Sequence, residues 1–111
     1  MENNIQTVLD NAARSIKNTL PGSTVLLFGS RARGDHKEDS DIDLCVLVPE
    51  YTYNRLEMIV DARCAFKQCV RMPLDLLLYT HDEFEESAKK PSRKQYHIKR
   101  EGVVLGDLKM V

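Results

Sequence analysis

The sequence has no long hydrophobic run and little net charge. The first absence argues against a membrane-spanning protein, and the second argues against partners that are bound through overall charge. No apolar stretch approaches the roughly 20 residues that a membrane-spanning helix needs. The first residues, MENNIQTVLDNAAR, lack the basic start and apolar core of a signal peptide. We therefore expect a cytoplasmic protein without membrane contact. The formal net charge is −1, so the overall field favours neither nucleic acid nor a membrane surface as a partner.

Cysteine is also scarce. The chain has 3 cysteines, Cys45, Cys64 and Cys69, an odd number without the paired spacing of a metal site. Cys45 lies in an apolar run and the other two fall in an expected helix. We expect all three to be reduced and to serve mostly in packing.

The length of 111 residues and the hydrophobic content of 42% predict a single domain, residues 1–111. Apolar periodicity predicts a helix over 3–19, a strand over 23–28, a short helix from Ser30, a strand over 42–48, a helix over 52–69, a strand over 74–79 and an edge strand at 103–105. In the second long helix, one face carries Tyr53, Leu56, Ile59, Val60 and Arg63. After His81 we expect an acidic turn, DEFEE, and then a basic segment over 89–100. Apolar strands alternating with helices predict an α/β fold in which helices cover the sheet.

Two aspartates stand one residue apart at the start of the second strand. Side chains alternate along a strand, so Asp41 and Asp43 project from one face. Two carboxylates this close repel each other, and one would normally take up a proton. A divalent cation removes the repulsion, and hard oxygen ligands favour Mg²⁺ or Mn²⁺. The pair therefore predicts a metal site of the kind that also binds nucleotide phosphates.

Asp75 stands alone among leucines in the third strand-like run, LDLLLY. A lone acid in such a strand would be poorly solvated unless it lay at the end of the sheet or met a cation. If this strand neighbours the strand over 42–48, Asp75 completes a cluster of three carboxylates. Such a cluster can hold metal ions that activate an attacking hydroxyl and a leaving pyrophosphate.

Gly29 and Ser30 mark a turn from an apolar strand into a short helix. A glycine there lets a phosphate approach the backbone, whose free N–H groups and helix dipole favour an anion. The Ser30 hydroxyl can add a hydrogen bond. Arg31 or Arg33 could neutralise phosphate charge and stabilise a departing pyrophosphate.

Two familiar binding loops do not fit this segment. Asp39, Asp41, Asp43 and Glu50 occupy positions 1, 3, 5 and 12 of a calcium-loop pattern, but Leu44 stands where that loop needs glycine. A Walker-type phosphate loop fails because no Gly-Lys-Ser/Thr follows the first glycine. Taken alone, the aspartates could belong to a solvated loop. Their combination with the glycine turn and a third acid favours a catalytic site.

The segment GSRARGDHKEDSDIDL resembles the signature of the nucleotidyltransferase superfamily that includes DNA polymerase β and kanamycin nucleotidyltransferase. In this signature a Gly-Ser pair precedes an Asp-x-Asp pair, and a third acid lies on a later strand. Here ten residues separate Gly29-Ser30 from Asp41-Ile42-Asp43. This spacing resembles the minimal nucleotidyltransferases (MNT), which include the antitoxins of HEPN–MNT toxin–antitoxin pairs.

The resemblance implies an α+β fold with a mixed sheet flanked by helices, and Mg²⁺-dependent transfer of a nucleoside monophosphate to a hydroxyl. By position, Asp41 and Asp43 would bind metal. Asp75 would be the third acid, which orients or deprotonates the acceptor. Gly29 and Ser30 would hold the triphosphate, assisted by one of the two arginines that follow.

For the antitoxin group, the resemblance implies ATP as the donor and a HEPN ribonuclease toxin as the partner, silenced by adenylylation of a tyrosine. Two alternatives stay open. The protein could neutralise its partner by binding alone, or the acceptor could be a small molecule or an RNA end. The basic segment over 89–100 is most often a solvated helix face, and we do not expect direct binding of nucleic acid.

Overall fold

One mixed sheet organises residues 5–107, the part of the chain that this computed structural model describes. Its four strands are β1 (Thr24–Phe28), β2 (Ile42–Val48), β3 (Leu74–Thr80) and β4 (Val103–Leu105), and they lie in the order β3-β2-β1-β4. β1 is antiparallel to both β2 and β4, whereas β2 and β3 are parallel. The expected sheet flanked by helices is confirmed, and each expected strand is present within a residue at each end.

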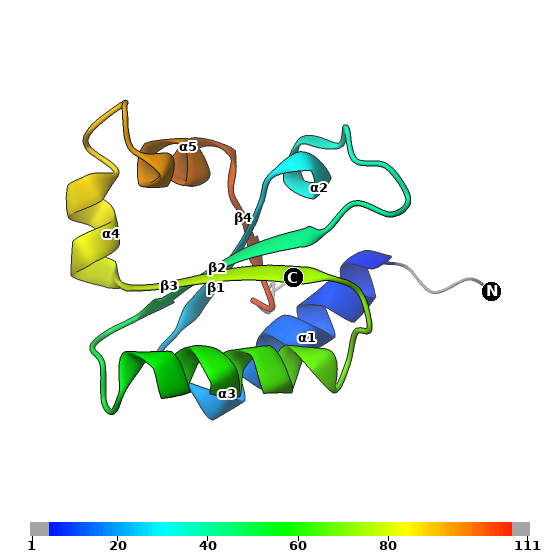
Figure 1. Ribbon diagram of the computed structural model, residues 1–111, viewed down its shortest axis with the longest axis horizontal. Helices are drawn as coiled ribbons and strands as arrows, with labels where there is room; N and C mark the ends of the chain where they lie inside the picture. Colours follow the sequence, from blue (N-terminus) through cyan, green and yellow to red (C-terminus); the bar gives the residue numbers. More distant parts are fainter. Residues whose placement is uncertain (1–4, 108–111) are drawn as a thin grey trace.

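Helices cover both faces of this sheet (Figure 1). On one face lie α1 (Ile5–Thr19) and α3 (Arg55–Lys67), and on the other lie α4 (His81–Ser87) and α5 (Lys94–Glu101). The one-turn helix α2 (Ser30–Arg33) follows β1 directly. No helix in residues 5–107 is long and apolar enough to cross a bilayer.

The central strand β2 is buried on both faces, which explains its uninterrupted apolar sequence. Alternate residues of the strand enter two separate cores. One core, beneath α1 and α3, includes Ile42, Leu44, Val46 and Val48. The other core is smaller, and there Cys45 and Leu47 pack with residues of α4 and α5.

Helix α3 is present, but its buried face differs from the face expected from the sequence. Leu56 and Val60 are 67% and 55% exposed, whereas Ile59 of the expected face is partly buried against the larger core. The residues that pack against the sheet and α1 are Met58, Ala62, Ala65 and Phe66.

Two arginines explain the orientation of α3. Arg55 and Arg63 donate hydrogen bonds to the carbonyls of Leu78 and Leu74, at N–O distances of 2.9 and 3.2 Å. These carbonyls belong to β3, a strand at the edge of the sheet. Because these carbonyls need hydrogen-bond donors, the side of α3 that carries the two arginines lies along β3. The alanines of the helix then face the sheet.

Two smaller expectations are wrong. The acidic DEFEE stretch is not a turn but most of α4, and a capping box between Thr80 and Glu83 starts this helix. Packing explains only one cysteine: Cys45 is buried, whereas Cys64 and Cys69 are exposed. All three thiols are free, as expected.

Candidate functional site

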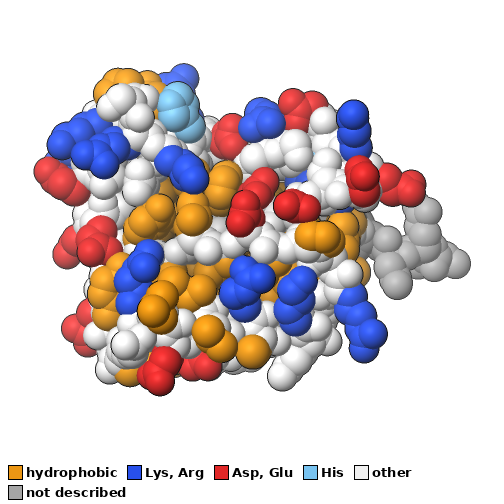
Figure 2. Space-filling view, viewed as in Figure 1, with side chains coloured by type: hydrophobic (Ala, Val, Ile, Leu, Met, Phe, Trp, Pro, Cys, Tyr) orange, Lys and Arg blue, Asp and Glu red, His pale blue; other side chains and the backbone are white. Residues whose placement is uncertain are grey.

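Asp43 and Asp75 lie side by side at the start of two parallel strands. Each is the second residue of its strand, and the two are direct partners in the β2–β3 register. By strand alternation both project from the face that α4 and α5 cover farther along the sheet. Asp41 precedes β2 and is exposed. Figure 2 shows acidic side chains over the part of the molecule where β2 and β3 begin.

Burial and the neighbouring acids together raise the pKa of the Asp43 carboxyl. Its partial burial raises the pKa of its carboxyl above the ordinary value, and the charges of Asp75 and Asp41 raise it further. Arg33 acts in the opposite direction but more weakly than these groups. The carboxylate therefore stands in a position where a cation would be stabilising.

Gly29 is in direct contact with the Asp43 side chain. Its backbone has φ 78° and ψ −158°, a region that is essentially restricted to glycine. A Cβ atom built on Gly29 would lie 2.2 Å from Asp43 Oδ2. The glycine turn expected from the sequence is thus present, and the glycine brings the backbone against the Asp43 carboxylate.

Ser30 starts α2 beside this contact. Its hydroxyl has no hydrogen-bond partner among residues 5–107. α2 has only four residues, so its macrodipole is small, and a phosphate would be bound by individual N–H and hydroxyl donors rather than by the helix as a whole.

The structure separates the two candidate arginines. Arg31 donates to the carbonyl oxygens of Ser40 and Glu38, at 3.0 and 3.2 Å, and so fixes the loop that leads into Asp41. Arg33 pairs with Asp35 at 3.3 Å and with Glu101 at 3.4 Å. Arg33 therefore shares a partner, Glu101, with the Gly29 N–H, and these two carboxylates raise the pKa of its guanidinium.

Glu101 belongs to this site, although it was not among the residues expected from the sequence. Its Oε2 accepts a hydrogen bond from the Gly29 N–H at 2.7 Å. The β1–β4 register pairs Leu27 with Val103, and continuing this antiparallel register by two residues brings Glu101 opposite Gly29. The sequence signal for this residue is indirect, because Glu101 is brought opposite Gly29 only once the register between β1 and β4 is known.

The oxygen ligands at the start of β2 and β3 suit a hard divalent cation. Within residues 5–107, no three His, Cys, Asp or Glu side chains already converge as a ready-made metal site. The aspartates would thus supply one or two ligands, with the rest from water and substrate phosphates. This is the coordination that Mg²⁺ usually has in nucleotide sites, so the donor set fits Mg²⁺ or Mn²⁺.

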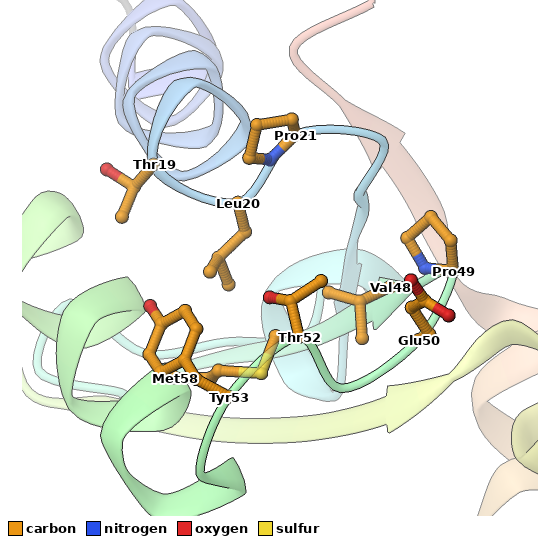
Figure 3. Close-up of a pocket in the computed structure, with 9 residues that line it drawn as sticks. All are labelled: Thr19, Leu20, Pro21, Val48, Pro49, Glu50, Thr52, Tyr53 and Met58. Atoms are coloured by element: carbon orange, nitrogen blue, oxygen red, sulfur yellow. The ribbon is translucent and has the colours of Figure 1, made fainter.

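A cavity of about 340 Å³ lies at the opposite end of β2 (Figure 3). It opens between the end of α1, the end of β2 and the start of α3, and its lining residues are Thr19, Leu20, Pro21, Val48, Pro49, Glu50, Thr52, Tyr53 and Met58. Val48 is five residues from Asp43, a separation of about 16 Å along a strand. The cavity is therefore not part of the acidic site.

The chain was compared with known families and solved structures. The family model for the nucleotidyltransferase domain matches residues 9–105. A crystal structure from Sulfolobus solfataricus, of a protein described as a nucleotidyltransferase, is 21% identical with a TM-score of 0.56, over 89% of this chain and 77% of that chain. A structure of a toxin–antitoxin with AMP-PNP is 20% identical with a TM-score of 0.53, over 85% of this chain and 68% of that chain. At these identities the two structures show the fold alone. A comparison with curated proteins gives no match.

Proposed function

Since the chain belongs to the nucleotidyltransferase domain family, we propose that it transfers AMP from ATP to a hydroxyl group, with Mg²⁺ or Mn²⁺ as the cofactor. The acceptor that we propose is a tyrosine of a cognate HEPN-type toxin, which would make the chain an antitoxin. One observation carries the proposal: Asp43 and Asp75 are register partners, and the Gly29 backbone touches the Asp43 carboxylate. This contact joins the metal-binding acids to the phosphate-binding turn.

Each acid has a role in the proposed reaction. Asp41 and Asp43 would hold the cation, which when bound neutralises charge on the triphosphate and on the leaving pyrophosphate. Asp75 is exposed at the edge strand, so it can reach an acceptor that comes from outside the chain. It would orient the acceptor hydroxyl and take its proton. The acceptor oxygen then forms a bond to the α-phosphorus, and the bond from this phosphorus to the bridging oxygen breaks to release pyrophosphate.

The glycine turn would bind the triphosphate. Gly29 contributes through its missing side chain, because its N–H already donates to Glu101. Ser30 offers a hydroxyl without a partner in residues 5–107. Arg33 would approach the phosphates, while Arg31 would act indirectly by fixing the loop before Asp41.

A partner protein as the acceptor has two kinds of support. A solved toxin–antitoxin structure with AMP-PNP shares the fold of this chain. The outer face of α3 also exposes two apolar side chains one helical turn apart, Leu56 and Val60, which a partner protein could cover. The second observation equally favours the alternative in which the chain neutralises its partner by binding alone.

Transfer of label from α-labelled ATP to the purified partner, with Mg²⁺ present, tests the catalytic proposal. We expect transfer by the wild type and its loss, by about 100-fold or more, in Asp41→Asn and Asp43→Asn, because each removes a metal ligand. Asp39→Asn is the matched control, since it neutralises an exposed acid of the same loop. Normal transfer by either site variant would refute the assigned metal site.

Co-expression with the toxin separates catalysis from binding. A chain that carries both Asp41→Asn and Asp43→Asn should fail to protect cells if adenylylation is required. Protection by this double variant would instead establish neutralisation by binding. The mass of the partner purified from the wild-type pair should be greater by one or more AMP groups. An unmodified partner would shift the acceptor to a small molecule or an RNA end.

A further inference from the structure

Helix α2 is held in place without a buried side chain of its own. It has four residues, Ser30–Arg33, and none of them is buried. A single helical turn is not stable by itself, because nucleation costs more than one turn of hydrogen bonds returns. Ala32 is partly buried against the larger core, and polar contacts from other elements add to this packing in fixing α2 and the glycine turn before it.

One carboxylate makes such contacts at both ends of α2. Glu101 Oε2 accepts from the Gly29 N–H at 2.7 Å, just before the helix begins. The same carboxylate lies 3.4 Å, through Oε1, from Nη1 of Arg33 at the end of the helix. Hydrogen bonds in which a partner is charged are stronger than neutral ones. No other acid in residues 5–107 contacts both Gly29 and Arg33.

The carboxylate comes from a well-anchored part of the fold. Glu101 is the last residue of α5, and Ile98 of the same helix is buried in the smaller core. The Gly102 N–H donates to the Ile98 carbonyl at 2.7 Å and ends the helix, after which β4 pairs with β1. The position of Glu101 is thus set by packing and strand pairing, independently of α2.

We propose that Glu101 is a positioning residue, which holds the Gly29-Ser30 turn and the Arg33 guanidinium in place for the nucleotide triphosphate. The proposal rests on the function proposed above and adds to it a residue outside the glycine and aspartate motifs. Glu101 itself touches neither metal nor phosphate. It leaves the Ser30 hydroxyl free to donate to a phosphate and keeps Arg33 on the same side of the turn.

The opposite role would also place a carboxylate here. An internal anion can occupy a phosphate site and compete with the ligand. The two roles predict opposite signs: removing a positioning residue weakens nucleotide binding, whereas removing a competitor strengthens it. The Ser30 hydroxyl favours positioning, because a competing carboxylate would be expected to occupy this donor as well.

Direct binding of AMP-PNP with MgCl₂, measured by calorimetry on the whole chain, tests the role. We expect Glu101→Ala to weaken binding by about ten-fold, the value of one charge-assisted hydrogen bond. Mn²⁺ binding without nucleotide should change less than two-fold, roughly within the additivity error for separate groups. Glu85→Ala is the matched control, since it removes an exposed carboxylate that pairs with Lys99 of α5. It should bind the nucleotide as the wild type does.

Glu101→Gln keeps an acceptor for the Gly29 N–H but loses the ion pair, so it should bind more tightly than Glu101→Ala. In an Arg33→Ala background the Glu101→Gln substitution should change binding less than in the wild type, because the ion pair is already absent and only the weaker hydrogen bond to the Gly29 N–H remains as a difference. This comparison tests the positioning role of Glu101 even if the Glu101→Ala variant does not fold.

The failures are distinguishable. A wild-type chain that binds no AMP-PNP refutes the proposed function. If the wild type binds and Glu101→Ala binds equally or more tightly, the positioning role is wrong while the proposed function stands. A Glu101→Gln effect that persists unchanged without Arg33 also overturns it.

Discussion

Replacement of Gly29 by alanine tests the contact on which the candidate site depends. The new Cβ would lie 2.2 Å from Oδ2 and 3.3 Å from Cβ of Asp43, and the backbone would have to keep φ 78° and ψ −158°. The backbone conformation costs about 1–3 kcal/mol for a residue with a side chain. Displacing a packed neighbour costs about 1–3 kcal/mol more. We therefore expect Gly29→Ala to destabilise the fold by roughly 2–6 kcal/mol, from these two costs.

Gly34 provides the matched control for this substitution. It ends the same helix with φ 87°, but a Cβ there would have no atom within 4 Å. Gly34→Ala should cost only the left-handed backbone conformation, about 1–2 kcal/mol. We therefore expect Gly34→Ala to be the milder of the two variants, since it lacks the contact with Asp43 and has the less restricted backbone conformation.

Urea unfolding of four chains measures this contact: wild type, Gly29→Ala, Asp43→Ala and the double variant. Shortening Asp43 removes the obstructing carboxylate, so the double variant should be more stable than the sum of the single effects predicts. A coupling energy of about 1–3 kcal/mol is expected for groups in contact. Equal losses at Gly29 and Gly34, together with no coupling to Asp43, would refute the close approach.

Three further predictions concern charge and burial. The pKa of Asp43 in the folded chain is raised above its ordinary value of 3.8, so ionisation of this carboxyl destabilises the fold as the pH rises above 3.8. Asp43→Asn should thus stabilise the metal-free chain at pH 7, by less than about 1 kcal/mol after solvent screening. Thermal melting with EDTA should show a higher melting temperature for the variant at pH 7 and no difference near pH 3. Met58→Ala should cost about 2–5 kcal/mol and Leu56→Ala less than about 0.5 kcal/mol in urea unfolding; the reverse order would restore the face expected from the sequence. Burial raises the pKa of Cys45 to about 12, so a thiol reagent at pH 8 should titrate the two exposed cysteines quickly and Cys45 only after unfolding.

The strands and the acids of the site could be predicted because local patterns determine them. The continuous apolar run over 42–48 indicates a strand that is buried on both faces, and β2 has those bounds. A lone acid in LDLLLY indicates the end of a strand, and Asp75 is the second residue of β3. In each case the residue types within the segment indicate its burial or its place in the strand, without knowledge of which other segments pack against it.

The predictions were wrong or incomplete where contacts with backbone groups far away in the sequence determine how an element is oriented. On α3, apolar residues occur around most of the helix, so periodicity could not select the buried side. The carbonyls of Leu74 and Leu78 select it, because they need donors and Arg55 and Arg63 supply them. Glu101 was missed for a related reason. Its role depends on the β1–β4 register, and a three-residue strand carries too little pattern to fix a register.

One face of β2 shows why the acidic site lies where it does. Asp43 and Cys45 are two residues apart on this face, a step of about 7 Å. At Cys45, the helices α4 and α5 exclude water, and burial alone raises the thiol pKa to about 12. At Asp43 the cover has ended, and the upward pKa shift comes partly from burial and partly from neighbouring carboxylates. One step earlier, Asp41 is exposed to solvent. Asp43 therefore lies at the boundary between the water-excluded part of this strand and solvent, where a carboxylate is partly shielded from water and its attraction for a cation is stronger than at a fully exposed position.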